Sequence, residues 1–236
     1  MKAVNKALPG LCIGIGLIVM GCLLSHGIIT VKDRDRIVTV KGLAEREVKA
    51  DRVIWPLVFK EIGNDITSIY NAVNKKNEIV CDFLKNNGIN DNEISIAAPQ
   101  IIDMRAERYA NNNEIPYRYN VTSVITVTSN QIDKVRELIS RQVDLLKQGV
   151  AIIDGDYRYT TQYSFTGLND IKPEMIEEAT VAARLAAEKF AKDSDSKLGK
   201  IRRANQGQFV ISNRDENTPY IKEVRVVTTI DYYLKD

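Results

Sequence analysis

The side chains best suited to nucleophilic or metal chemistry are scarce in this chain. It has one histidine, His26, and three cysteines, of which Cys12 and Cys22 share a single apolar run with His26. A Ser-His-Asp or Cys-His site uses histidine as its base, and histidine or cysteine side chains hold most zinc ions. The chain after residue 31 has no histidine and a single cysteine, Cys81, which cannot form a thiolate zinc site by itself. We therefore expect no catalytic residue, no metal ligand and no cofactor-binding residue there.

Acidic side chains are the remaining candidates for catalysis. Glu177 and Glu178 are adjacent on an expected helix, with Arg184 and Lys189 close enough in sequence for ordinary ion pairs. Acid–base catalysis by two carboxylates needs environments that push their pKa values apart, and nothing in the sequence marks such a pair. A hydrolase that uses carboxylates alone is therefore the weakest functional alternative.

Cys81 is the only cysteine after residue 31, so no disulfide can form within that part of the chain. It lies in residues 79–84, whose spacing of apolar side chains is typical of a helix. Free cysteine is commonly a small core side chain. We interpret Cys81 as a buried core thiol, and a redox-active thiol is the alternative.

The apolar run at residues 11–29 contains no charged side chain, and the short leader before it carries Lys2 and Lys6. About 19 residues make roughly 28 Å of α-helix, close to the ~30 Å core of a bilayer. A basic start followed by an apolar core is the form of a signal sequence. We expect residues 1–31 to be an N-terminal tail and a transmembrane signal anchor, since no small-residue cleavage site follows the run.

Two other fates of this segment stay open. Residues 19–22, Val-Met-Gly-Cys, have the order of a lipoprotein signal in which Cys22 is acylated, and a peptidase that cuts near Ser25 is the third alternative. The charges after the run alternate in sign, so positive-inside counting is ambiguous. The short tail favours an orientation with the tail inside. We therefore expect a protein anchored in the inner membrane with its domain facing the periplasm.

The charge of the remaining chain excludes one class of partner. The chain carries 33 basic and 31 acidic residues, and Lys2 and Lys6 are the only charged side chains before residue 32. The part after the anchor is therefore formally neutral. Nucleic-acid-binding proteins carry a basic excess, so we expect no nucleic-acid partner.

The elements that position these side chains follow one order twice. In two repeats, at about residues 51–129 and 156–234, apolar spacing predicts strand, helix, strand, strand. Residues 130–148 predict a helix that links the repeats. Two such units suit antiparallel sheets with helices packed on one face. The predicted fold class is α+β, with one domain over residues 32–236 after the transmembrane helix.

In the first repeat, residues 51–62 predict a strand, and residues 66–84 predict a helix with an N-cap at Asn64-Asp65 and an end at Asn86-Asn87-Gly88. The hairpin that follows is expected at 93–105 and 117–129, with a turn at 111–113. The second repeat predicts the same order, namely a strand at 156–165, a helix at 171–190, and strands at 200–212 and 221–234 around a turn at 213–218.

Aromatic side chains mark the first strand of the second repeat. Tyr157, Tyr159, Tyr163 and Phe165 alternate with polar residues and would share one face of that strand. We interpret this face as sheet core or as a half-buried aromatic ladder across strands. A binding surface or a subunit interface is the alternative, because tyrosine is enriched in interfaces.

Residues 40–51 resemble the opening motif of the SIMPL-domain family, in which a strand, a glycine and an acidic residue precede a Pro-Asp pair. Here the glycine is Gly42, and Ala50 stands where many members have proline, before Asp51. The alanine-rich helix at 179–191 and the segment that follows it, with Gly199, are a closer match. The resemblance runs from about residue 36 to 234. We interpret Gly42, Asp51 and Gly199 as structural, since glycine permits a turn or a close backbone approach.

The resemblance implies an extracytoplasmic protein of the periplasm or cell envelope, in a branch with an N-terminal anchor. Members of the family are associated with oxidative-stress defence and, in some cases, with ring-like oligomers. No catalytic residue is carried over. We therefore expect a membrane-anchored protein that is not an enzyme and that acts by homo-oligomeric assembly or by binding. The alternatives are a solute-binding or stress-sensing module, whose ligand the sequence does not identify, and the carboxylate-only hydrolase.

Overall fold

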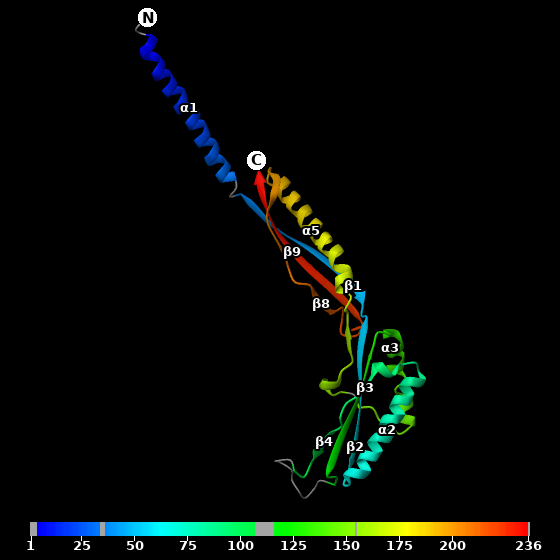
Figure 1. The fold of residues 1–236 in the computed structure, drawn as a ribbon. Helices are drawn as coiled ribbons and strands as arrows, with labels where there is room; N and C mark the ends of the chain where they lie inside the picture. Colours follow the sequence, from blue (N-terminus) through cyan, green and yellow to red (C-terminus); the bar gives the residue numbers. More distant parts are fainter. Residues whose placement is uncertain (1–3, 34–35, 107–115, 154, 236) are drawn as a thin grey trace. The chain divides into compact units, whose positions relative to one another are not determined.

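The chain folds into an α+β structure with antiparallel sheets, which confirms the predicted class (Figure 1). The computed structural model describes residues 4–33, 36–106, 116–153 and 155–235. The chain divides into two compact units, and each is described by itself. Unit 1 comprises Met1–Arg46, Asn169–Val210 and Val224–Asp236, and unit 2 comprises Glu47–Leu168 and Ile211–Glu223.

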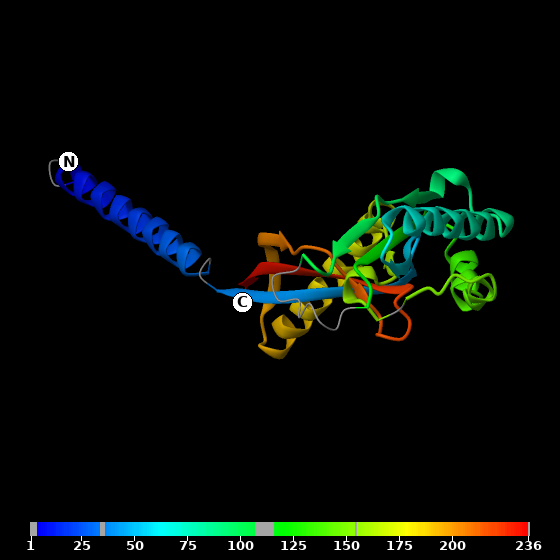
Figure 2. The same ribbon diagram turned by 90° about the horizontal axis from the view of Figure 1, so that it is seen from below.

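The N-terminal segment is a single helix, α1, at Val4–Asp33 (Figures 1 and 2). Its side chains are described over residues 13–28, and the large apolar ones are exposed, for example Ile18 and Leu23. Within the described part of the chain, no helix is long and apolar enough to cross a membrane. The predicted helix is thus confirmed, whereas its expected role as a membrane span is not.

Unit 2 contains a five-stranded antiparallel sheet in the order β3-β5-β2-β6, with β4 also paired to β5. The two long strands run side by side over their whole length, from Val53 opposite Ser129 to Gly63 opposite Tyr119. The elements of this unit are β2 (Arg52–Gly63), α2 (Ile66–Asn86), β3 (Ile94–Ile96), β4 (Gln100–Asp103), β5 (Tyr119–Ser129), α3 (Ile132–Ser140), α4 (Val143–Lys147) and β6 (Gln162–Ser164).

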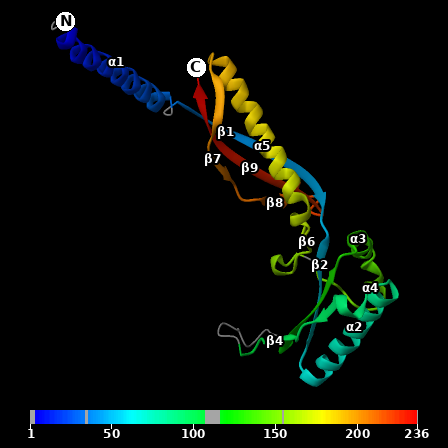
Figure 3. The same ribbon diagram turned by 45° about the horizontal axis from the view of Figure 1, so that its top comes forward.

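The core of unit 2 lies between this sheet and its helices. The predicted apolar face of β2 is buried, and side chains of α2, α3 and α4 pack against it. Figure 3 shows these three helices on one side of β2. Alternation on a strand and spacing of three and four on a helix place these side chains on single faces. The members include Val53, Trp55, Leu57, Phe59, Val73, Val80, Leu84, Ile125, Val135, Leu138 and Leu145.

The ends of α2 follow the predicted signals. The Asp65 carboxylate accepts a hydrogen bond from the backbone N–H of Ser68 at 2.9 Å, which satisfies one of the free donors of the first turn. After Asn87, Gly88 adopts φ of 82°, the left-handed conformation that ends many helices. The N-cap and the end of this helix are confirmed.

Unit 1 contains most of a four-stranded sheet in the order β1-β9-β7, with β8 paired to β9. Strands β1 and β9 are antiparallel, because the residue numbers of their contacts rise along β1 while they fall along β9. Arg36 O accepts from Leu234 N at 2.9 Å, Thr39 donates to Asp231 at 2.8 Å, and Glu45 pairs with Arg225 at 3.4 Å. The elements are β1 (Ile37–Lys49), α5 (Leu168–Asp193), β7 (Lys197–Gln206), β8 (Val210–Asn213) and β9 (Ile221–Lys235).

The interior of unit 1 is built largely from small side chains. The buried face of α5 is Met175 followed by alanines at every fourth position, 179, 183, 187 and 191. Alanine lets a helix approach a strand closely. A Cβ on Gly42 of β1 would lie 1.8 Å from Ala179 O and 2.5 Å from Ala183 N. The core cluster of this unit therefore holds few large residues, chiefly Val40, Ile230 and Tyr232.

The prediction for the start of the second repeat is wrong. Residues 156–165 do not form one strand, because Tyr157–Tyr159 is a 3₁₀ turn and only Gln162–Ser164 is extended, as β6. The turn forms because the Asp156 side chain accepts from the backbone N–H of Arg158 at 3.1 Å and also pairs with its guanidinium. β6 pairs with β2. The strand that pairs with β9 on the other side from β7 is β1, which contains most of the opening motif.

Other predicted elements are present but interrupted. The strand expected at 93–105 is two short strands, β3 and β4, separated by residues 97–99 that include Pro99, which cannot donate to a ladder. The linking helix at 130–148 is two helices, α3 and α4. The strand expected at 200–212 is β7 and β8, separated by residues 207–209. The turn expected at 111–113 lies outside the described residues.

Candidate functional site

The side chains best suited to nucleophilic or metal chemistry lie on separate elements. His26 and Cys22 are exposed on α1, whereas Cys81 lies on α2 against the core of unit 2. No group of three or more histidine, cysteine, aspartate or glutamate side chains among the described residues could hold a metal ion. Burial raises the pKa of the Cys81 thiol. A raised pKa lowers the thiolate fraction and with it the reactivity of this cysteine.

Of the two adjacent acids of α5, Glu178 takes part in surface ion pairing, together with Glu174. Arg46 contacts Glu174 at 2.8 Å and Glu178 at 3.9 Å. The acidic side chains are exposed, so these pairs are screened by water and contribute little to stability. The basic partner is Arg46 of β1 rather than the Arg184 or Lys189 expected from the sequence.

The residues of the opening motif make close contacts. The Asp51 carboxylate accepts hydrogen bonds from Thr166 N at 2.9 and 2.8 Å, from Thr166 Oγ1 at 3.0 Å and from Gly167 N at 2.9 Å. It thereby fixes the segment that leads into α5. A Cβ on Gly199 would lie 2.7 Å from Tyr233 O on the neighbouring strand. Neither glycine of the motif, Gly42 or Gly199, has room for a side chain.

The tyrosines expected on one strand face lie in different surroundings. Tyr157 is 86% exposed in the 3₁₀ turn. Tyr163 on β6 packs edge-to-face on Tyr220, with ring centroids 6.1 Å apart. Tyr220 also carries the guanidinium of Arg136 over its ring, at 3.6 Å from the centroid. An aromatic ladder along residues 157–165 is therefore absent, and Tyr163 has a partner from the segment before β9.

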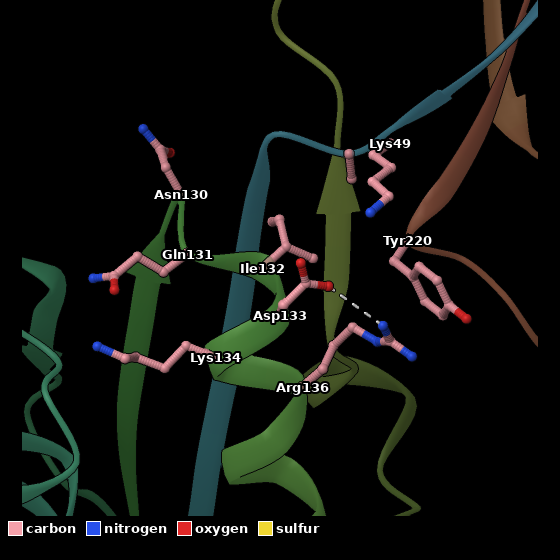
Figure 4. Close-up of a pocket in the computed structure, with 9 residues that line it drawn as sticks. Lys49, Asn130, Gln131, Ile132, Asp133, Lys134, Arg136 and Tyr220 are labelled. Atoms are coloured by element: carbon pink, nitrogen blue, oxygen red, sulfur yellow. Dashed lines mark ion pairs between the residues drawn. The ribbon is translucent and has the colours of Figure 1, made fainter.

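This Arg–Tyr–Tyr stack borders a cavity of unit 2 that is lined by charged, polar and apolar side chains, here called the α3 pocket. Its volume is about 400 Å³, within the range of small-molecule sites. It opens where the start of α3 faces the end of β1 and the residue before β9 (Figure 4). The lining residues are Lys49, Ala50, Asn130, Gln131, Ile132, Asp133, Lys134, Arg136 and Tyr220.

Backbone hydrogen bonds place the walls of the α3 pocket. Ala50 N donates to Tyr220 O at 2.8 Å, which joins the end of β1 to the segment before β9. Gln131 precedes α3 without a capping side-chain bond. Within the described chain, no group accepts from the backbone N–H groups of Ile132, Asp133 and Lys134. The first turn of α3 thus presents free donors and the positive end of the helix dipole.

The charged side chains of the pocket fall into two groups. Figure 4 shows the side chains of Lys49, Asp133 and Arg136 directed toward the same gap beside Tyr220. Asp133 and Arg136 form an ion pair with atoms 3.6 Å apart, longer than a good hydrogen bond. Lys134 instead donates to Gly88 O at 3.2 Å. The gap therefore offers two cations and one carboxylate side by side.

A second cavity in unit 2 is almost entirely apolar. It has a volume of about 350 Å³ between α2 and the sheet, and it is lined by Ile66, Thr67, Tyr70, Val73, Pro99, Ile101 and Val121. It offers shape and apolar contact but only two hydroxyl groups for specificity. The α3 pocket is the stronger candidate because it combines charge, backbone donors and an aromatic wall.

Sequence reasoning did not assign the α3 pocket. Its residues come from the end of β1, the start of α3 and the residue before β9, and only the folded chain brings these together. One feature of the sequence lies near it: the Pro-Tyr pair at 219–220, which recurs at 116–117 in the first repeat. That Gln131 rather than Asn130 stands at the N-cap of α3 is seen only in the structure.

Comparison with known proteins gives a family and no activity. No curated protein matches the chain. The family model described as "SIMPL: Protein of unknown function (DUF541)" matches residues 38–229, which is most of the chain and includes the β1 motif, both units and the α3 pocket. This protein therefore belongs to the SIMPL family.

Proposed function

We propose that this SIMPL chain acts without catalysis, as a protein held at a membrane by its N-terminal helix, facing the periplasm, and associating with further copies of itself. The observation that carries the proposal is a contrast within unit 1. Its buried helix face is mostly alanine, whereas Val181 and Leu185 on the opposite face of α5 are 50% and 60% exposed. A thin core and exposed large apolar side chains favour further burial against another protein surface.

Membrane attachment is supported by the sequence of α1 rather than by a complete span. Residues 13–28 are helical, uncharged and exposed. By themselves they are too short to cross a bilayer, so a span also needs the flanking residues 11–12 and 29–31, which are apolar except for Thr30. Acylation at Cys22, which is exposed on the helix, is the alternative form of attachment.

Assembly is tested by measuring the mass of the full chain in detergent by light scattering. We expect a mass of several copies, and the double change Val181→Glu with Leu185→Glu should return it to one copy, because it buries charge in the proposed contact. Arg184→Glu is the matched control, since it changes the charge of the same exposed helix equally. A single-copy mass at every concentration contradicts the assembly proposal.

Orientation is tested in intact cells with a membrane-impermeant maleimide. Tyr157→Cys supplies a thiol at an exposed position of unit 2, and we expect it to be labelled from outside the inner membrane once the outer membrane is permeabilised. Protection of that thiol until the inner membrane is broken would place the domain inside. Peroxide survival of cells with and without the chain tests the link to oxidative-stress defence.

A second candidate function is solute binding, and the α3 pocket is the observation that favours it. A cavity of about 400 Å³ with charged side chains, free backbone donors and an aromatic wall has the composition of a small-molecule site. Native mass spectrometry of the full chain released from detergent tests this function. A bound small molecule that is lost on Arg136→Gln supports it, and a bare chain in every preparation counts against it.

A further inference from the structure

We propose that the α3 pocket recognises a free α-amino acid, by its carboxylate and its ammonium group together. The inference rests on the second candidate function, solute binding, and adds the chemistry of the ligand. Its basis is that the pocket places charges of both signs beside one gap, with Lys49 and Arg136 near Asp133 (Figure 4). A simple anion would meet repulsion from Asp133, and a simple cation would meet repulsion from the other two.

Arg136 is prepared for a carboxylate. Its guanidinium lies over the ring of Tyr220 at 3.6 Å, and that ring is held in turn by Tyr163 at 6.1 Å. A guanidinium fixed in this way keeps its planar fork of donors in one orientation, which is the geometry that pairs with a carboxylate. Arg136 has only a loose ion pair, at 3.6 Å to Asp133, so its donors remain largely available.

The start of α3 and Lys49 add to the carboxylate half of the site. The first-turn N–H groups of α3 have no acceptor among the described residues, and Lys49 forms no ion pair with any described residue. A carboxylate at this end of the helix is favoured by the dipole as well as by the free donors. These groups come from two separate elements, β1 and α3, so the cationic half does not depend on the helix end alone.

Asp133 supplies the other half. Its side chain is 80% exposed and its one ion pair, to Arg136, is long, so its oxygens are free to accept from an ammonium group. The ammonium and carboxylate groups of an α-amino acid are bonded to the same carbon atom and therefore lie close together. The opposite charges of Asp133 and Arg136 are also close to each other. Ile132 and the ring of Tyr220 provide the apolar wall, which favours an apolar side chain on the ligand.

The experiment is calorimetric titration of the full chain in detergent with L-leucine, preceded by a thermal-shift screen of the twenty standard amino acids. Two analogues separate the charges, 4-methylpentanoate, which lacks the ammonium, and 3-methylbutylamine, which lacks the carboxylate. We expect leucine to bind and each analogue to bind at least about tenfold more weakly, because one charged hydrogen-bonded contact is lost in each case.

Matched variants assign the charges to residues. Arg136→Gln and Asp133→Asn should each weaken leucine binding at least about tenfold, and Lys49→Gln about threefold. Arg141→Gln, Asp144→Asn and Lys75→Gln make the same changes outside the pocket and should leave binding unchanged. Lys49 is exposed and Asp133 is largely exposed, so these two variants test the site without disturbing the core.

Several results would overturn the inference while leaving the proposed functions intact. If none of the twenty amino acids binds, or if both analogues bind as well as leucine, the pocket does not recognise a zwitterion. A different bound solute in native mass spectra would then keep solute binding but reject its assigned chemistry. The mass of the assembly is measured separately, so its failure and the failure of this site are distinguishable.

Discussion

The Asp51 carboxylate links two segments of unit 2 that are far apart in the sequence. It accepts from Thr166 N, Thr166 Oγ1 and Gly167 N, more than one hundred positions along the chain. Charge-assisted bonds of this kind are stronger than neutral ones. We expect Asp51→Ala to lower the free energy of unfolding by about 2–3 kcal/mol, since three donors lose their acceptor. Urea unfolding of the full chain measures this.

The control for Asp51 is Asn, which keeps one acceptor oxygen. Asp51→Asn should lose less stability than the alanine variant, because part of the clamp on Thr166 and Gly167 remains. Equal losses for the two variants would mean that one acceptor oxygen in a side chain of the same shape is not enough, and that the contact needs the whole carboxylate. If neither variant changes the free energy of unfolding, the interpretation of Asp51 as a structural residue is wrong.

Lys222 is a buried cation without an acidic partner among the described residues. Its side chain is on the inner face of β9 and donates to the amide oxygen of Asn213. Burial lowers the pKa of this amine below its usual 10.5. The unfolded chain then binds more protons than the folded chain between the folded pKa and 10.5. Stability contributed at this residue therefore rises as the pH is raised through that interval.

We expect Lys222→Met to remove this alkaline rise and to stabilise the fold at neutral pH, because an apolar side chain of similar length needs no hydration. The free energy of unfolding is measured with urea at neutral and alkaline pH for the native chain and the variant. The difference between the two values at each pH gives the contribution of the lysine. Lys75→Met, at an exposed position of α2, is the control. A difference that does not change with pH would contradict the prediction.

At the scale of elements, the closest approach in unit 1 is between β1 and α5. A side chain on Gly42 would collide with the helix backbone, at 1.8 Å from Ala179 O. Backbone cannot yield as a flexible side chain can. We expect Gly42→Ala to cost about 1–3 kcal/mol of stability through overpacking, measured by thermal and urea unfolding. Leu43→Ala, on the exposed side of the same strand, should stay within about 0.5 kcal/mol.

The elements also show what periodicity can and cannot predict. The long amphipathic helices and the long strands were predictable because each buries one continuous face, as in β2, α2 and β9. The segment at 156–165 alternates as cleanly, but the local bond from Arg158 N to Asp156 diverts it into a turn. β1 was recognisable only through its motif, since its alternation is interrupted by glycine and charge. Local hydrogen bonding thus overrode the pattern.

The composition of the candidate site could not be predicted from the sequence. The sequence shows that the chain after residue 31 has no histidine and one cysteine, Cys81. It does not show that Lys49, Arg136 and Tyr220 meet, because the bond from Ala50 N to Tyr220 O joins segments from opposite ends of the domain. A pocket built from such distant segments has no short sequence motif, so it cannot be recognised from one sequence.

At the scale of the molecule, the two units differ in how they are held together. Unit 2 buries large side chains such as Leu57, Phe59 and Leu84 in one cluster, whereas the cluster of unit 1 is small and rich in alanine. Buried apolar area supplies most of the stabilisation of a domain. Unit 1 should therefore open more readily than unit 2 unless other surfaces cover it.

Hydrogen exchange of the full chain in detergent tests this difference. Amides at the centre of β5, near Ile125, should be more protected than those at the centre of β9, near Val226, because local opening is least costly where few apolar contacts are lost. The double change Val181→Glu with Leu185→Glu should lower protection in β9 and leave β5 unchanged if assembly covers α5. Equal protection of the two strands in both chains would mean that the alanine-rich unit is self-sufficient. The exposed side chains of α5 would then no longer argue for a partner.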